Sequence, residues 1–180
     1  MNRNRQLDGL RGIASIIVLC VHGIIAFNFA IFTGQTKHSI FSWDIYYSGA
    51  PFLLPLAGNF GVCLFFVLSG YVLSISLSNS NLGLIALIFK RYTRFTIPIL
   101  AACLTSYALL ASGFIYNQEF ALISKSTWLA DQMQQNPILS EAIYEGLIGA
   151  LWTANPTKTT YSAVLWTMPI EFRGSIIMAV

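Results

Sequence analysis

Residues 60–77 read FGVCLFFVLSGYVLSISL, and none of their side chains is charged. About 20 mostly apolar residues are enough for an α-helix to cross the ~30 Å hydrocarbon core of a bilayer. The stretch lies within residues 45–89, which contain no Asp, Glu, Lys or Arg. Pro51 and Pro55 precede it and suit a loop or an interfacial entry, because proline breaks the helical hydrogen-bond ladder. We therefore predict a membrane-spanning helix at residues 60–77.

Two further runs have the length of a membrane span. Residues 12–32 hold His22 as their one ionisable side chain of note, and residues 95–116 contain no Asp, Glu, Lys, Arg or His. A cleaved signal peptide is the alternative for the first run, since Arg3 and Arg5 give it a basic start. The run is too long for that and no clean cleavage site follows it, so we predict a first membrane span there.

The C-terminal part of the chain is mixed in character. Residues 142–152 are too few to span a bilayer, so we expect a short helix that is interfacial or buried. Apolar character returns over residues 163–180, interrupted by Glu171 and Arg173. Together with the runs above, this predicts an all-α, polytopic transmembrane helix bundle with about four spans. We expect residues 1–180 to be a single membrane domain, incomplete at its C-terminus because the chain ends inside an apolar run.

Composition excludes most soluble classes of protein. Of the 180 residues, 56% are hydrophobic and 9% are charged, whereas soluble domains carry about 25% charged residues. No basic stripe interleaved with aromatic residues occurs, so we expect no nucleic-acid partner. Cys20, Cys63 and Cys103 all fall in apolar runs. They are typical of small buried apolar residues, and their spacing predicts no disulfide.

The lysines and arginines near the ends of the spans predict the orientation of the chain. One basic cluster precedes the first span and another separates the second span from the third, while Lys37 is the one basic residue between the first two spans. The clusters are Arg3, Arg5 and Arg11, and Lys90, Arg91 and Arg94. A cytoplasmic N-terminus places both clusters in the cytoplasm. We therefore predict an integral, multi-pass membrane protein in a lipid bilayer, with residues 117–162 on the far side.

Arg11 and His22 are the first candidates for chemistry. At about 100° and 1.5 Å per residue, their spacing puts both side chains on one helix face, about 16 Å apart along the axis. Ionisable groups at membrane depth are costly, so each is a functional hypothesis. The pair places a phosphate-binding group and a proton-transfer group along one wall. The alternative is structural, with Arg11 reaching the membrane surface and His22 hydrogen-bonding in helix packing.

Glu171 is a carboxylate in an otherwise apolar segment. It can orient or charge-stabilise an imidazole, as the carboxylate of an acyl-transfer triad does. Alternatively, it forms a structural ion pair with Arg173 or Arg11. His38 lies in a predicted loop and is a weaker functional candidate. Two widely separated histidines without nearby carboxylates do not form a metal site, so we expect no metal.

Four motifs, in order along the chain, resemble the acyltransferase 3 family of membrane acyltransferases. Residues 7–14, LDGLRGIA, with His22 closing an Arg-x10-His spacing, are similar to its first helix. Residues 61–71, GVCLFFVLSGY, resemble its second signature. Residues 91–98, RYTRFTIP, resemble its basic segment, and residues 165–172, LWTMPIEF, its Leu-Trp-Ser/Thr-x-x-x-Glu motif. The proline inside the last motif and the Arg-Gly-Ser that follows it are most similar to fungal members.

The resemblance implies a fold of about ten spans, of which this chain holds the first part. It also implies transfer of an acyl group from acyl-CoA, as donor substrate, to a hydroxyl of a carbohydrate or small molecule. His22 and Arg11 match the functional pair of the family, and Arg91, Arg94 and Glu171 match its other recurrent polar positions.

From these residues we predict direct transfer with His22 as general base, which takes the proton of the acceptor hydroxyl as its oxygen attacks the thioester carbonyl. Arg11, Arg91 and Arg94 are predicted to hold the phosphates of coenzyme A, because guanidinium groups form paired hydrogen bonds with phosphate. Glu171 is predicted to orient the site.

Two alternatives stand beside this mechanism. A covalent route through Cys20 or Ser69 is disfavoured, because neither has an evident paired base in the sequence. The other alternative is not an enzyme: a transporter or a membrane assembly subunit would use the arginine and the histidine as a substrate or proton path.

Overall fold

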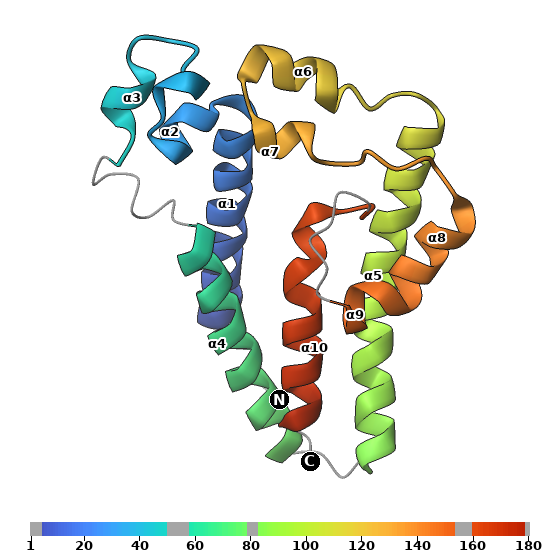
Figure 1. Ribbon diagram of the computed structural model, residues 1–180. Coiled ribbons are helices and arrows are strands. Elements are labelled where there is room, and N and C mark those ends of the chain that lie inside the picture. The colour runs from blue at the N-terminus through green and yellow to red at the C-terminus, as the bar shows by residue number, and fades with distance from the viewer. Residues whose placement is uncertain (1–4, 50–57, 79–82, 154–159, 179–180) are drawn as a thin grey trace. The chain divides into compact units, whose positions relative to one another are not determined.

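The computed structural model describes residues 5–49, 58–78, 83–153 and 160–178. Within these ranges every regular element is helical (Figure 1), which confirms the predicted all-α class. In the described part of the chain, three helices are long and apolar enough to cross a membrane. They are α1 (Arg5–Phe27), α4 (Gly58–Ser78) and α5 (Leu84–Ala111).

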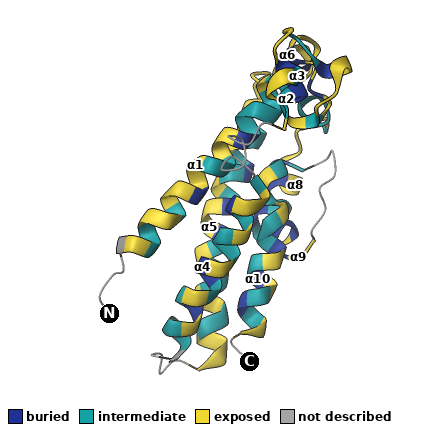
Figure 2. Cartoon of the chain, turned by 90° about the vertical axis from the view of Figure 1, so that its left-hand side faces the viewer, coloured by how far each residue is buried: buried dark blue, intermediate teal, exposed yellow. Residues whose placement is uncertain are grey.

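The surfaces of the three long helices suit a lipid environment. In the most apolar window of each helix, no more than 17% of the residues are buried inside the protein. Figure 2 shows exposed residues along most of the length of α1. Apolar side chains that face outwards over such a length are stable in hydrocarbon and costly in water. The chain is therefore an integral membrane protein.

The first span differs from the predicted residues 12–32 at both ends. α1 begins at Arg5 and ends at Phe27, and the backbone leaves the helix at Asn28, with φ −145° and ψ 77°. The Asn28 side chain donates a hydrogen bond to Asp44 Oδ1 at 2.8 Å. Short polar side chains with such local partners favour non-helical backbone. A separate short helix, α2 (Phe29–Thr33), then follows.

The third span also differs from its prediction, residues 95–116. α5 begins at Leu84 and ends at Ala111, so the basic cluster that includes Arg94 lies inside the helix and not between two spans. Long basic side chains tolerate this position because their stems carry the charge towards the membrane surface. Pro98 also lies inside α5, and it lacks the N–H that would bond the Arg94 carbonyl.

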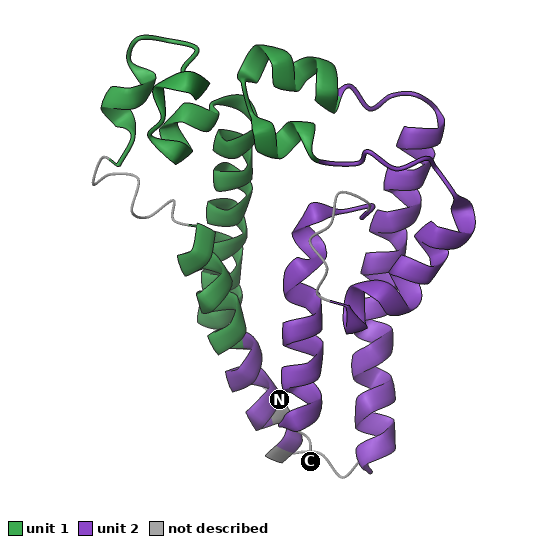
Figure 3. Ribbon diagram, viewed as in Figure 1, with its two compact units in different colours: residues 1–68, 117–131 green, residues 69–116, 132–180 purple. Residues whose placement is uncertain are grey.

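The chain forms two compact units, coloured separately in Figure 3. Unit 1 comprises residues 1–68 and 117–131, and unit 2 comprises residues 69–116 and 132–180. The first half of α4 therefore belongs to unit 1 and its second half to unit 2. Besides α1 and α2, unit 1 holds η1 (Thr36–His38), α3 (Asp44–Tyr47), α6 (Asn117–Ser124) and α7 (Thr127–Ala130).

Two glycines of α4 allow it to pack closely against α1 within unit 1. A Cβ atom on Gly61 would lie 2.9 Å from Val18 Cγ2, and one on Gly58 would lie 3.1 Å from Val21 Cγ1. The first distance is too short for a real contact, so a larger residue at position 61 would push the helices apart. Small residues at helix contacts are typical of membrane proteins, because they let the backbones approach.

Asp44 organises the loop that follows α1. Its side chain is wholly buried and accepts hydrogen bonds from the backbone N–H groups of Ile40 at 2.7 Å and Phe41 at 2.8 Å, and from Asn28. Burial acts to raise the pKa of this carboxyl, but the hydrogen bonds favour the charged form and hold the pKa below its ordinary value of 3.8.

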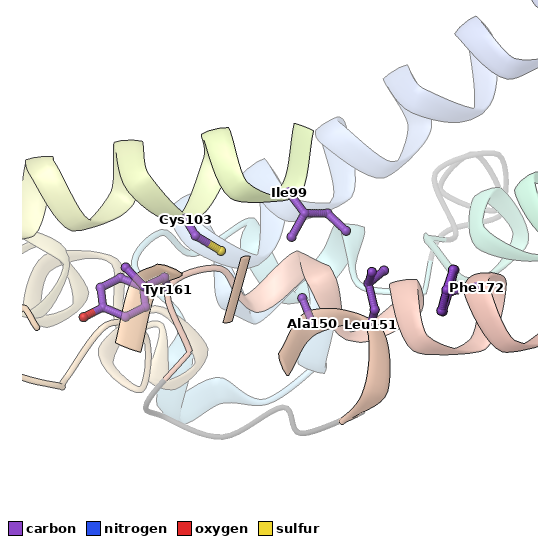
Figure 4. Packing of buried hydrophobic residues seen from close by; sticks show 7 residues of the cluster. Ile99, Cys103, Ala150, Leu151, Tyr161 and Phe172 are labelled. Carbon is purple, nitrogen blue, oxygen red and sulfur yellow. The ribbon is translucent and has the colours of Figure 1, made fainter. Parts of the chain in front are cut away.

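Unit 2 contains the short helix that the sequence predicts at residues 142–152, and one face of it is buried. It consists of α8 (Leu139–Tyr144), a π-helical turn η3 (Glu145–Gly149) and α9 (Ala150–Trp152). A Cβ atom on Gly146 would lie 2.8 Å from Leu100 Cα, so glycine is required where this helix crosses α5. Figure 4 shows the resulting core, whose buried members are Ile99, Cys103, Ala142, Ala150, Leu151, Tyr161 and Phe172.

The fourth predicted span is represented by a short helix. η4 (Ala163–Thr167) leads into α10 (Met168–Ile177), which has a proline in its first turn, where no backbone N–H partner is needed. The ten residues of α10 rise about 15 Å, roughly half the thickness of the hydrocarbon core. The described residues therefore confirm three of the four spans.

Candidate functional site

His22 lies near the end of α1, in unit 1, and is half-buried. Its Nδ1 lies 2.7 Å from the carbonyl oxygen of Val18, one helical turn earlier. A carbonyl oxygen only accepts hydrogen bonds, so we assign the proton to Nδ1. The imidazole also packs edge-on against Trp128 of α7, with ring centroids 5.8 Å apart and planes at 61°.

Arg11 lies three turns before His22 on the same helix and is also half-buried. α1 is unbroken between the two residues, so the expected sharing of one helix face holds. Between them, Ser15 Oγ donates to the backbone carbonyl of Arg11 at 3.0 Å, a bond in which the guanidinium takes no part. Unit 1 thus contains a cation and a half-buried imidazole on one wall of α1.

A second polar cluster lies in unit 2 and joins α4, α5 and α10. Ser69 Oγ donates to Glu171 Oε1 at 2.6 Å, and Arg91 Nη2 donates to Ser69 Oγ at 3.3 Å. Ser69 is only 8% exposed. Because a hydroxyl both donates and accepts, Ser69 links a guanidinium to a carboxylate. The two opposite charges compensate each other across one neutral group, which lowers the cost of holding them among apolar helices.

A second contact, besides its hydrogen bond to Ser69, restrains the Arg91 side chain, whereas Arg94 makes neither kind of contact with the residues that the structure describes. The guanidinium carbon of Arg91 lies 5.2 Å from the centre of the Phe95 ring, in a cation–π contact. Arg94 is exposed and forms no hydrogen bond with a residue that the structure describes. Of the predicted site residues in unit 2, the structure thus brings Arg91 and Glu171 together, while Arg94 stays outside their cluster.

Arg173 is not the partner of Glu171 that the sequence allows for. Its guanidinium donates to the carbonyl of Trp152, at the end of α9, where helical carbonyls lack an intrahelical partner. The Trp152 ring also packs edge-on against Phe172, with centroids 5.6 Å apart. Arg173 therefore joins α10 to α9, and Glu171 remains bonded to Ser69.

The weaker candidates have structural roles. His38 is buried, and its Nδ1 donates to the Lys125 carbonyl at 2.9 Å.

Cys103 is buried as predicted, but Cys20 and Cys63 are exposed, because they lie on outward faces of the spans. Among the residues that the structure describes, no group of three His, Cys, Asp or Glu side chains is placed to hold a metal ion.

Glu145 is a carboxylate that sequence analysis did not single out. It begins the π-helical turn, and its Oε2 accepts a hydrogen bond from the Tyr161 N–H at 3.0 Å. Burial raises the pKa of this carboxyl, although the hydrogen bond from Tyr161 acts to lower it. The contact ties residue 161 to the helix that packs on α5, which is a structural function.

The comparisons with known proteins identify the family. The model of the acyltransferase 3 family, described as an acyltransferase domain, matches residues 4–180, nearly the whole chain. The chain belongs to the acyltransferase 3 family. The resemblance drawn from the four motifs is thereby confirmed. No curated protein and no solved structure matches the chain.

Two contacts of this membrane acyltransferase were missed by sequence analysis. The sequence analysis names Ser69 only as a disfavoured nucleophile without an evident paired base, whereas it bonds both Arg91 and Glu171. Its position in the second motif was the available signal. Trp128 lies in the mixed segment after α5 and carried no signal, because its contact with His22 depends on how that segment returns to α1.

Proposed function

We propose that this acyltransferase moves an acyl group from acyl-CoA to a hydroxyl of a carbohydrate or small-molecule acceptor, with His22 as general base. The 2.7 Å contact between His22 Nδ1 and the Val18 carbonyl carries the proposal. With its proton on Nδ1, a neutral imidazole has a free lone pair on Nε2. Nε2 forms no hydrogen bond with a residue that the structure describes, and a proton acceptor of this kind is what a general base requires.

In the proposed reaction the acceptor oxygen attacks the carbonyl carbon of the thioester. Its O–H bond breaks as the new C–O bond forms, and the proton moves to His22 Nε2. The tetrahedral intermediate then loses coenzyme A as a thiolate, which takes the proton back from the imidazolium. The products are the acceptor ester and coenzyme A, and the enzyme returns to its starting state. A base in this position contributes about 10² to 10⁴-fold in rate.

Arg11, Arg91 and Arg94 are proposed to bind the phosphates of coenzyme A. Guanidinium groups suit phosphate because they donate two parallel hydrogen bonds. Arg91 is restrained by Ser69 and by Phe95, which reduces the conformational entropy that it would lose on binding. Glu171, bonded to the same serine, is proposed to orient this part of the site.

A transfer assay tests the proposal against the non-enzymatic alternative. Membranes that contain the protein are incubated with acetyl-CoA labelled in the acetyl group, with and without candidate sugar acceptors. Label that moves onto an acceptor hydroxyl, and is released from it by mild base, supports acyl transfer. Membranes with the His22→Ala variant are the matched control. Uptake of an acceptor without labelling would support a transporter and reject the proposed function.

A further inference from the structure

Trp128, which lies outside α1, packs its side chain against the His22 ring. It lies in α7, a four-residue helix that is distant from His22 in the sequence, and its ring meets the imidazole edge-on at 5.8 Å between centroids. Both residues are in unit 1. His22 Nδ1 is held by its own helix. The Trp128 contact adds a restraint from a different part of the chain.

Ser126 anchors α7 to the end of α1. Its Oγ donates to the carbonyl of Ile25 at 2.7 Å and accepts from the Leu129 N–H at 3.2 Å. Ile25 belongs to the last turn of α1, where carbonyls commonly need a partner from outside the helix. The serine is 1% exposed. The Ser126 hydroxyl thus supplies a hydrogen-bond partner to a carbonyl at the end of α1 and to an N–H at the start of α7. It thereby fixes the position of Trp128, two residues further along.

Lys125 anchors the same segment to the loop after α1. Its carbonyl accepts from His38 Nδ1 at 2.9 Å, and its Nζ donates to the Ser39 carbonyl at 2.5 Å. Its backbone has φ +51°, a left-handed conformation that non-glycine residues adopt at a cost. Such a conformation persists where surrounding contacts determine it. Residues 125–126 are thus fixed at two points, each with its own hydrogen bonds.

We propose that residues 125–130 form a clamp on α1, in which Trp128 is a positioning residue that fixes the orientation of the His22 imidazole for acyl transfer. This inference rests on the proposed function. The hydrogen bond to Val18 alone lets the imidazole tilt about its Nδ1 contact, and the indole ring packed against it restricts that tilt. Nε2 is thereby kept in one direction, and misplacement of a catalytic group by about 1 Å can cost up to about 10²-fold in rate.

A matched pair of substitutions separates positioning from packing. Trp128→Leu removes the ring beside His22, and Trp128→Phe retains an aromatic edge there. Phe120→Leu is the control, because Phe120 of α6 makes the same kind of edge-on contact with Phe27 of α1, at 5.2 Å, without touching His22. Turnover and the KM values for acetyl-CoA and acceptor are measured per folded molecule. The rate at which diethyl pyrocarbonate modifies His22 reports the freedom of the ring without relying on catalysis.

We expect Trp128→Leu to lower kcat about tenfold, with little change in the KM for acetyl-CoA, and to speed the modification of His22. In Trp128→Phe, kcat and the modification rate of His22 should both lie close to the wild-type values. Phe120→Leu should match the wild type in both. The clamp is rejected if Trp128→Leu and Phe120→Leu change kcat and the modification rate of His22 to the same extent. It is also rejected if Trp128→Leu changes neither quantity while His22→Ala is inactive. In both cases the proposed function stands. Full activity of His22→Ala would instead reject the proposed function.

Discussion

Ser69 Oγ lies 2.6 Å from Glu171 Oε1, although the two residues are 102 positions apart in the sequence. This is a short distance for a hydroxyl–carboxylate hydrogen bond and is typical of a charge-assisted one. Ser69 Oγ also accepts a hydrogen bond from Arg91 Nη2. Loss of the hydroxyl would therefore remove the shared partner of an anion and a cation at once.

Ser69→Ala should lower both the stability and the acyl-transfer activity of the protein. A partly buried polar group that loses its partner costs on the order of 1–3 kcal/mol. Ser69→Thr retains a hydroxyl and should be closer to the wild type. Thr105→Ala is the control, since it removes a hydroxyl that donates to the Ala101 carbonyl of its own helix. Thermal unfolding in detergent and activity per folded molecule are the measurements. Wild-type values of both in Ser69→Ala would contradict the linking role.

Hydrophobicity predicted the existence of the spans better than their ends. The run at residues 12–32 continues past the true end of α1, because the side chain of Asn28 finds Asp44 and the backbone leaves the helix there. An average of hydropathy over a run of residues does not detect this hydrogen bond between two distant side chains. Likewise, the sequence predicts the basic cluster before residue 95 between two spans, although long basic side chains can lie inside the end of a spanning helix.

The candidate site was predicted by residue type but not by contact. Glu171 is predicted as a costly carboxylate in an apolar segment, and that argument needs only the sequence. Arg91 is predicted only through the resemblance to the family. Their connection through Ser69 needs three helices to meet, which no local pattern encodes. The contact of Trp128 with His22 likewise arises from the path of the chain after α5.

The Asp44 carboxyl should make stability depend on pH. Its pKa is below 3.8 in the folded protein, so the folded state releases the proton more readily than the unfolded state. The stabilisation is therefore present above about pH 3.8 and is lost as the pH falls through the lower, folded pKa. Asp44→Asn should destabilise the protein at neutral pH by about 1–3 kcal/mol, because an amide cannot accept every hydrogen bond that the carboxylate accepts.

The check on Asp44 is the gap in Tm between the wild type and Asp44→Asn across a pH series. The gap should be widest at neutral pH and should narrow on acidification below the ordinary pKa, because only the wild type has this carboxylate to protonate. A gap that stays constant down to low pH would show that the hydrogen bonds around Asp44 do not depend on its charge.

The proposed orientation, with the N-terminus in the cytoplasm, can be tested with single cysteines in a background that lacks the three native ones. Lys90→Cys, before the apolar part of α5, should react with an impermeant reagent only from the cytoplasmic side. Thr127→Cys, after α5, should react only from the opposite side. Lys37→Cys is the control and should behave as Thr127→Cys does, because Lys125 bonds the Ser39 carbonyl and so joins the two loops. Labelling of positions 90 and 127 from the same side would remove α5 from the set of spans.

The roles proposed for His22 and Arg11 predict different kinetic failures. His22→Ala removes the proton acceptor but leaves the arginines in place, so turnover should fall by about 10²-fold or more while acetyl-CoA binding changes little. Arg11→Lys keeps the charge but loses the planar pair of donors, so binding of coenzyme A should weaken more than the unchanged charge suggests. If both residues serve only helix packing, each substitution should lower the yield of folded protein and leave specific activity intact. Activity is therefore measured per folded molecule, with coenzyme A binding assayed separately on the same preparations. His22→Ala with full specific activity would exclude the imidazole as the base, and Arg11→Lys with unchanged coenzyme A affinity would remove Arg11 from the donor site.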